Sequence, residues 1–328
     1  MLFENRALRG LLVPCLLLGS IAVGEVLAQS YPNKPIRMAV GFTAGSGADI
    51  VGRSIADKLV ESLGQTVIIE NRPGAGGSLA TERALQSPAD GYNLLLLTSS
   101  APIQTALKGK QLRYNLERDV SPVSLAVIGP LLLITHPSVP ARNIRQLVAL
   151  AKAQPDYLAY GSSGVGSSAH LAAALFAQLA RVKLTHVPYK GSGEAVIGVT
   201  TGEVAIGFPS AASALSLIKA GRLRALALTT EERAPFLPDI PTLSESGVAG
   251  YDFTIWYSVV APAKTPQQVI TRLNEAIVKA CSQPSLRSEL NGQGLEPKSS
   301  SPEQLGAFIS REIAKSTKLI DLAGVKAD

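Results

Sequence analysis

The alternation of apolar and polar positions divides the chain after residue 30 into short apolar runs and longer amphipathic stretches. Apolar runs of roughly five to eight residues are typical of buried strands, and the amphipathic stretches between them are typical of helices. Strands are predicted at 36–42, 66–71, 92–100, 157–163, 183–189, 204–210 and 223–230, and helices at 49–64, 78–87, 143–155, 167–180, 193–202 and 214–221. Continuous apolar runs such as Leu94–Leu97 suit a parallel sheet covered on both faces, so the pattern predicts an α/β fold.

Two long extended segments, at 123–136 and 251–261, interrupt this alternation. We interpret them as crossings between two lobes: the chain leaves domain 1, builds domain 2 and returns. The predicted domains are residues 29–131 together with 253–328, and residues 132–252. Two crossing strands allow a hinge, and a hinge between α/β lobes forms a cleft that can close on a ligand. One continuous, larger sheet is the alternative.

Three helices are predicted to complete the chain. Two of them begin with similar tetrapeptides, Thr265-Pro266-Gln267-Gln268 and Ser301-Pro302-Glu303-Gln304. A hydroxyl residue followed by Pro, with Gln three positions after the hydroxyl, is the pattern of a capping box. We therefore expect Thr265 and Ser301 to cap these helices.

The first 28 residues have the pattern of a secretory signal peptide. Arg6 and Arg9 precede the apolar run 11–24, and small or apolar residues up to Ala28 predict cleavage after that position. A retained membrane anchor is the alternative, although the run is shorter than the ~20 apolar residues of a spanning helix. Cleavage leaves Cys281 as the single cysteine, so no intramolecular disulfide is expected. We expect an exported, unbridged protein in a bacterial periplasm.

The composition is that of a globular protein, with 17% charged and 46% apolar residues. Aromatic residues make up only 5%, which argues against a platform that stacks the bases of single-stranded nucleic acid. The formal charge of +6 comes from scattered Lys and Arg, so it agrees with ordinary solubility or with a mild attraction for anions. No nucleic-acid partner is expected.

Four loops rich in Gly, Ser and Thr follow predicted strands, at 43–49, 71–78, 98–100 and 161–170. The first, second and fourth are predicted to lead into helices. Ligands of open α/β sheets bind at the carboxyl ends of strands, where the unpaired N–H groups of a helix N-terminus attract anions. If the first and fourth loops belong to facing lobes, they can hold one carboxylate from both sides. For each loop alone, a tight strand-to-helix turn without a ligand is the alternative.

Reactive chemistry has little support in the motifs. The first loop has Ile50 where a Rossmann fingerprint needs its third glycine, and it lacks the Lys of a P-loop. Neither Ser46 nor Ser163 lies in a nucleophile elbow. No pair of histidines has metal-ligand spacing. We therefore expect no catalytic residue, metal or cofactor, and the remaining alternative is a hydrolase whose Ser and His meet only in three dimensions.

Asp49 is the most specific candidate for a functional side chain in these loops, because it follows the first loop at the predicted start of a helix. An acid at this place is favoured by the helix dipole and can cap the first turn. Alternatively it orders the loop, or meets an amino group or a bridging water on the ligand.

The chain resembles the Bug/TctC family, the periplasmic solute receptors of tripartite tricarboxylate transporters, from about Tyr31 to its end. The order and spacing of several segments carry the resemblance. They include YPNKPIRMAVGFTAGSGADIVGR, GQTVIIENRPGAGGSLATE, PADGYNLLLLTSS, YGSSGVGSSAHLAAALF, VPYKGSGEAV and WYSVVAPAKTP.

This resemblance implies a class II periplasmic-binding-protein fold, with two lobes and a ligand carboxylate gripped by the first and fourth loops through backbone groups and water. The implied ligand-binding residues are Phe42, Thr43, Ala44, Gly45, Ser46, Gly47, Asp49, Thr98, Ser99, Gly164, Val165, Gly166, Ser167, Ser168, His170, Tyr189 and Phe208. The implied ligand is a di- or tricarboxylate, an acidic amino acid or an aromatic acid. The implied protein is a monomer, not an enzyme, that delivers its ligand to a tripartite-type permease or a sensor.

The sequence departs from the family pattern in two places. Ser46 separates Gly45 from Gly47 where relatives usually have paired glycines, and the GEVAIGF segment lacks an Asp that relatives often carry. Capture of a carboxylate by backbone donors is expected to survive both changes, whereas selectivity for the far end of the ligand is expected to differ.

Overall fold

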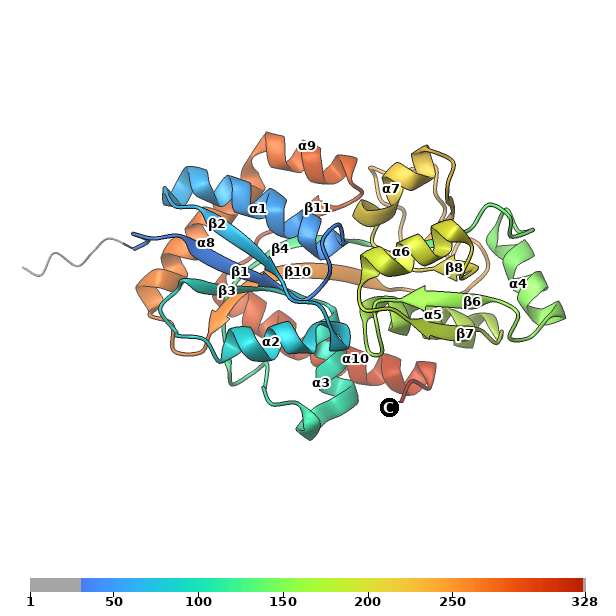
Figure 1. Ribbon diagram of the computed structural model, residues 1–328, viewed down its shortest axis with the longest axis horizontal. Coiled ribbons are helices and arrows are strands. Elements are labelled where there is room, and N and C mark those ends of the chain that lie inside the picture. The colour runs from blue at the N-terminus through green and yellow to red at the C-terminus, as the bar shows by residue number, and fades with distance from the viewer. Residues whose placement is uncertain (1–30, 327–328) are drawn as a thin grey trace, which may run out of the picture. The chain divides into compact units, whose positions relative to one another are not determined.

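Two β-sheets, each covered by helices, organise residues 31–326 of the computed structural model, the part of the chain that the structure describes (Figure 1). The first sheet has six strands in the order β11-β4-β10-β3-β1-β2, and the second has five in the order β7-β6-β8-β5-β9. The strands of the first sheet are β1 (Ile36–Val40), β2 (Val67–Asn71), β3 (Asn93–Thr98), β4 (Val120–Pro130), β10 (Thr254–Pro262) and β11 (Glu296–Pro297). Those of the second are β5 (Leu132–Thr135), β6 (Ala159–Ser162), β7 (Thr185–Pro188), β8 (Ile206–Gly207) and β9 (Arg224–Leu228). We call each sheet with its helices a lobe.

The helices follow the strands much as the sequence predicts. The first lobe contains α1 (Gly47–Leu63), η1 (Ala75–Gly77), α2 (Ser78–Leu85), α3 (Ser100–Lys108), η2 (Gly109–Gln111), α8 (Gln267–Ser282), α9 (Pro284–Gly292) and α10 (Pro302–Ala323). The second contains α4 (Ile144–Ala153), α5 (Ser168–Ala180), α6 (Ser192–Thr201) and α7 (Ala211–Lys219). In Figure 1 the helices lie on both faces of the first sheet.

Strand β3 shows how the apolar pattern builds this core. Leu94 and Leu96 belong to the hydrophobic cluster that includes residues of α1 and α8, whereas Leu95 and Leu97 face the cluster beneath α2 and α10. Both faces of the strand are therefore buried, as the continuous apolar run predicts. The sheet is nevertheless mixed rather than purely parallel, because β3 pairs in parallel with β1 and antiparallel with the returning strand β10.

The predicted long strand at 123–136 is in fact two strands in different sheets. β4 ends in the first sheet, β5 begins in the second, and Leu131 lies between them. The chain returns to the first sheet at β10, and the two passages are joined by the side chain of Thr229. Leu131 N–H donates to Thr229 Oγ1 at 2.9 Å, and the same hydroxyl donates to Phe253 O at 2.7 Å. The domain boundaries at 131/132 and 252/253 stay predictions.

Three local predictions are wrong. Helix α3 was not expected, because the predicted strand extended to Ser100, where the helix begins; all four loops therefore lead into helices. Its Pro102 lies in the first turn, where a missing N–H costs no helical hydrogen bond. The short strand β11 was also not expected. Thr265 does not cap a helix, since its hydroxyl donates to Pro262 O at 2.7 Å and α8 begins after it. The capping box at Ser301 is confirmed.

The predictions for the N-terminal segment, a signal peptide over 1–28 with cleavage after Ala28, lie outside the described residues. Within residues 31–326, no helix has both the length and the apolar character needed to cross a bilayer. Cys281 is a free, buried thiol there, and burial raises its pKa to about 12.

Candidate functional site

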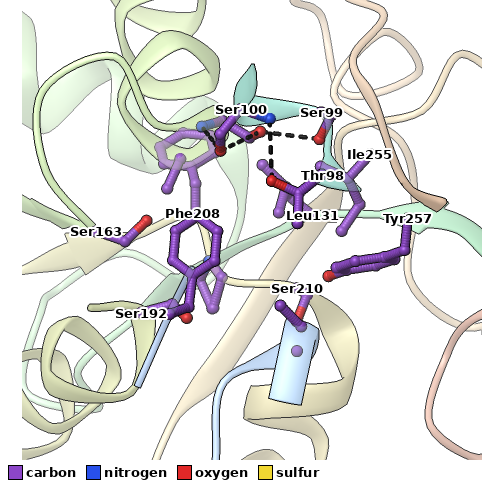
Figure 2. Close-up of a pocket in the computed structure, with 16 residues that line it drawn as sticks. Thr98, Ser99, Ser100, Leu131, Ser163, Ser192, Phe208, Ser210, Ile255 and Tyr257 are labelled. Atoms are coloured by element: carbon purple, nitrogen blue, oxygen red, sulfur yellow. Dashed lines mark hydrogen bonds between the residues drawn. The ribbon is translucent and has the colours of Figure 1, made fainter. Parts of the chain in front are cut away.

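The N-termini of five helices converge on one pocket (Figure 2). Two of these helices, α1 and α3, belong to the first lobe, and three, α5, α6 and α7, belong to the second. The lining residues are Phe42, Gly47, Ala48, Thr98, Ser99, Ser100, Leu131, Ser163, Ser168, Ala169, Ser192, Phe208, Pro209, Ser210, Ile255 and Tyr257. Each helix N-terminus directs the positive end of its dipole toward the pocket, which favours a bound anion without a cationic side chain.

The first loop is held in shape by its own hydrogen bonds. Gly45 has φ +76°, which favours glycine, and Ser46 accepts the N–H of Asp49 at 3.2 Å as the N-cap of α1. The Asp49 carboxylate in turn accepts the N–H of Gly45 at 2.9 Å and bonds from Arg53 and Asn71, each at 3.0 Å. Asp49 is buried behind the pocket rather than in its lining. Of the three roles considered for it, these contacts favour ordering the loop.

The fourth loop repeats this geometry in the other lobe. Gly166 has φ +71°, and Ser167 accepts the N–H of His170 at 3.2 Å as the N-cap of α5. His170 Nδ1 accepts the N–H of Gly166 at 3.1 Å, as the Asp49 carboxylate does for Gly45. Burial and the adjacent His186, whose ring stacks on His170 at 4.1 Å, lower the pKa of His170 to about 4. The imidazole is therefore neutral and serves as an acceptor inside the loop.

A cluster of serine hydroxyls joins the two lobes inside the pocket. Ser168 Oγ lies 2.9 Å from Ser99 Oγ and 3.1 Å from Ser100 Oγ, and Ser168 N–H donates to Ser100 Oγ at 3.1 Å (Figure 2). The N-termini of α3 and α5 therefore face each other across the boundary between the lobes. Hydroxyls in this position can turn their hydrogens toward a bound anion.

Two further hydroxyl groups, those of Ser210 and Tyr257, lie close to the backbone of Gly47. A Cβ at Gly47 would lie 2.0 Å from Ser210 Oγ and 2.8 Å from Tyr257 Oη, so only glycine leaves room for them. Burial raises the pKa of the Tyr257 phenol, which stays protonated. The described residues that line the pocket include no Asp, Glu, Lys, Arg, His or Cys.

Apolar side chains occupy the space between the hydroxyl groups. In Figure 2 Phe208, Leu131 and Ile255 lie between Ser99 and Ser100 on one side and Ser192 and Ser210 on the other. The cavity itself has a volume of ≈50 Å³. It is smaller than the engineered cavity of about 150 Å³ that binds one benzene molecule.

Six of the residues implied by the family resemblance line this pocket: Phe42, Gly47, Thr98, Ser99, Ser168 and Phe208. The other eleven do not line it: Thr43, Ala44, Gly45, Ser46, Asp49, Gly164, Val165, Gly166, Ser167, His170 and Tyr189. Most of these form the frames of the two glycine loops. Thr43 packs against Gly191 of the second lobe, and Tyr189 packs against Gly161 and Gly198.

Ten lining residues are not among those that the resemblance implies: Ala48, Ser100, Leu131, Ser163, Ala169, Ser192, Pro209, Ser210, Ile255 and Tyr257. Four of them, Ala48, Ser100, Ser163 and Ala169, lie within the candidate loops 43–49, 98–100 and 161–170. Ser192 had a usable signal, because it stands between the predicted strand 183–189 and the predicted helix 193–202. Ser210 had a similar one, because it ends the predicted strand 204–210 ahead of the predicted helix 214–221. Ile255 and Tyr257 lie on β10 and had none, since only the pairing of β10 with β3 and β4 brings them to the pocket.

Comparisons with known proteins agree on one family. The family model described as "Tripartite tricarboxylate transporter family receptor", TctC, matches residues 51–325. Protein BugT of Bordetella pertussis is 36% identical over 302 residues, which are 92% of this chain and 93% of BugT.

Two solved structures from Rhodopseudomonas palustris have the same fold. Rpa4515, solved with adipate, is 33% identical with a TM-score of 0.88 and covers 90% of this chain and 99% of its own. MatC, solved with bound malate, is 28% identical with a TM-score of 0.84 and covers 88% and 100%. The expected two-lobed periplasmic-binding-protein fold is confirmed. The chain belongs to the Bug/TctC family of receptors of tripartite tricarboxylate transporters.

Proposed function

We propose that this protein is an exported solute receptor that captures a small carboxylate in the pocket between its lobes. The observation that carries the proposal is the convergence of five helix N-termini, from both lobes, on a pocket lined by hydroxyls. The malate bound to MatC and the adipate with Rpa4515 support the same ligand class.

In this proposal the binding energy comes from charge-assisted hydrogen bonds to the carboxylate. A carboxylate that accepts hydrogen bonds from helix N-termini and serine hydroxyls gains about 1.5–3 kcal/mol from each charge-assisted bond. Several such bonds suffice for micromolar affinity, which corresponds to ~8 kcal/mol. The site residues are those of the two glycine loops together with the hydroxyls of Ser99, Ser100 and Ser168, while Phe42 and Phe208 wall the ligand.

Binding in this proposal requires the lobes to move. A cavity of ≈50 Å³ is too small for a dicarboxylate, so the ligand enters when the lobes separate and is enclosed when they close. The two passages at Leu131 and Phe253, joined through Thr229, are the proposed hinge. It lies at the predicted boundaries between residues 29–131 with 253–328 and residues 132–252.

We further propose that the protein is not an enzyme. A serine nucleophile needs an adjacent base, and the pocket lining offers only the protonated Tyr257 as a titratable group. His170, the base of the hydrolase alternative, does not line the pocket, and its Nδ1 is occupied by the N–H of Gly166. The receptor is proposed to be a monomer that delivers its ligand from the periplasm to a tripartite-type permease or a sensor.

The test is a ligand titration of protein freed of co-purified acids by unfolding and refolding. Thermal-shift and calorimetric measurements against a library of di- and tricarboxylates, acidic amino acids and aromatic acids are expected to give at least one micromolar ligand. The ligand should be recovered unchanged after prolonged incubation. Absence of any shift and any heat across the library contradicts capture of a carboxylate, and formation of a product supports the hydrolase.

A further inference from the structure

Behind the serine cluster, a second side chain of α3 reaches across to the other lobe. Gln104 is fully buried, and its Nε2 donates to the backbone oxygen of Val165 at 2.7 Å. Ser100 and Gln104 are four residues apart on α3, so they lie on the same face of the helix. Ser100 contacts Ser168 in the pocket, and Gln104 contacts the loop that leads into the helix starting at Ser168.

The amide of Gln104 lies between two glycines, one from each lobe. A Cβ at Gly76 would lie 2.2 Å from Gln104 Nε2, and a Cβ at Gly166 would lie 2.5 Å from the same atom. Both glycines have positive φ, +63° and +71°. The second and fourth glycine loops therefore leave a slot whose width matches a planar amide, and Gln104 fills it.

The hydrogen-bond pattern of Gln104 is one-sided. Its Nε2 is used by Val165 O, whereas its buried Oε1 has no partner among the described residues. A buried amide oxygen without a partner destabilises the folded protein, so we expect another contact of the glutamine to compensate for it. The reason that the contacts offer is the donor: within the slot, the amide N–H₂ satisfies the part-buried Val165 carbonyl of the other lobe.

We infer that Gln104 is a positioning residue. Its hydrogen bond to Val165 O, which we call the latch, holds the closed lobes together and fixes the fourth loop in its anion-binding geometry. Gln104 does not touch the ligand. It acts through the loop 164–168, which leads into α5 and to the Ser168 hydroxyl in the pocket lining. The inference rests on the proposed function, since a latch matters for binding only if the closed lobes hold a ligand. It predicts that Gln104 controls ligand release more than ligand entry.

The first experiment compares Gln104→Leu with the wild-type protein in stopped-flow measurements with adipate and malate. Loss of the donor is expected to raise the dissociation rate by roughly 5- to 10-fold, the factor that one buried hydrogen bond contributes, and to leave the association rate within about twofold. Gln268→Leu, the same change at an exposed position of α8, is the matched control and is expected to change neither rate. Equal dissociation rates for Gln104→Leu and wild type overturn the latch.

A second variant separates the hydrogen bond from mere packing. In Gln104→Glu the ionised carboxylate faces the Val165 carbonyl, so dissociation is expected to be fast at neutral pH. A protonated carboxyl can donate as the amide does, and burial raises the pKa of a carboxyl. The ratio of dissociation rates, variant to wild type at the same pH, is therefore expected to approach one as the pH falls. A ratio independent of pH contradicts the role of the donor.

A third measurement needs no ligand, so it distinguishes failure of the latch from failure of the proposed function. Hydrogen exchange over residues 161–171 of the ligand-free protein is expected to be faster in Gln104→Leu than in wild type, while exchange in β1–β3 is unchanged. If the wild type binds no acid but this difference is found, the latch stands and carboxylate capture fails. If acids bind and neither release nor exchange changes, the latch fails alone. Gln104→Met serves the same tests if Gln104→Leu does not fold.

Discussion

Asp49 and His170 hold equivalent positions in the two lobes, each accepting the N–H of the left-handed glycine that precedes the N-cap serine. One lobe uses an ionised carboxylate for this purpose, and the other uses a neutral imidazole. The helix N-termini beyond them are oriented alike, but the two loops respond differently to substitution and to pH. Both responses can be measured.

Replacing Asp49 by Ala is expected to destabilise the first loop and with it the fold. The change leaves the Gly45 N–H without its acceptor, leaves Asn71 Nδ2 with Phe42 O alone, and removes an ion pair with Arg53. We expect a loss of about 2–3 kcal/mol in the free energy of unfolding, measured by urea denaturation. Asp57→Ala, at an exposed position of the same helix, is the control. Equal midpoints for the two variants contradict the structural role.

Acid is expected to destabilise the protein through His170 first. Its pKa is lowered from 6.5 to about 4, so the unfolded chain binds a proton at higher pH than the folded protein does. Stability is therefore complete above pH ~6.5 and decreases as the pH falls toward 4, by roughly 3 kcal/mol at most. Burial opposes ionisation of Asp49, but bonds from Arg53, Gly45 and Asn71 lower the pKa of its carboxyl, so its contribution is lost only at still lower pH.

The measurement is a series of urea unfolding curves from pH 7 to pH 4. His170→Leu is expected to flatten the decrease between pH 6.5 and 4. A wild-type stability that is constant over this interval contradicts the assignment.

Removing the hydroxyl of Ser168 is expected to weaken binding without weakening the fold. Ser168→Ala keeps the N–H that donates to Ser100 Oγ but removes the group that bridges Ser99 and Ser100. One lost hydrogen bond to a charged ligand corresponds to about 1.5 kcal/mol, or roughly tenfold in Kd, measured by calorimetry. Ser216→Ala on the exposed side of α7 is the matched control. An unchanged Kd for Ser168→Ala places the ligand elsewhere.

A methyl group at Gly47 is expected to obstruct the pocket. The Cβ of Gly47→Ala would lie 2.0 Å from Ser210 Oγ, so the N-terminus of α1 or that of α7 must shift. We expect affinity for the carboxylate to fall by at least ~10-fold, since the loss of one charge-assisted hydrogen bond costs about 1.5 kcal/mol. Gly306→Ala on α10 meets nothing closer than 3.6 Å and is expected to bind normally.

The sequence located the two glycine loops but not the whole pocket, for a physical reason. A strand that ends in glycine and serine before an amphipathic helix is a local pattern, so Gly47 and Ser168 could be predicted. Helix α3 could not be predicted in this way, because the polar residues after β3 are also typical of a strand end and Pro102 is not typical of a helix interior. Tyr257 reaches the pocket only through the antiparallel pairing of β10 with β3, a contact between residues far apart in the chain. Such contacts depend on the register of the folded sheet, which no short window of sequence contains.

The last prediction concerns Thr229, which is fully buried where the chain passes between the lobes. Its hydroxyl accepts the N–H of Leu131 and donates to the oxygen of Phe253, so one side chain ties both passages together. Thr229→Val keeps the shape but leaves both backbone groups unpaired, which is expected to cost about 2–3 kcal/mol in the free energy of unfolding. The control is Thr317→Val, because Thr317 is exposed on α10 and its hydroxyl donates only to Ile313 O of the same helix.

If the two passages are the hinge, the same substitution also changes how the lobes move. In Thr229→Val the backbone bonds from Thr229 N–H to Leu131 O and from Phe253 N–H to Thr229 O remain, but the side-chain link between the two passages is lost. We therefore expect the exchange of amides in β5 and β9 to rise in the ligand-free protein and to be suppressed again by ligand. The effect of the ligand is informative, because in a variant that is only less stable the ligand slows amide exchange throughout the protein. In a variant with a looser hinge the ligand slows exchange mainly in β5 and β9. A variant with normal stability and normal exchange would place the hinge elsewhere.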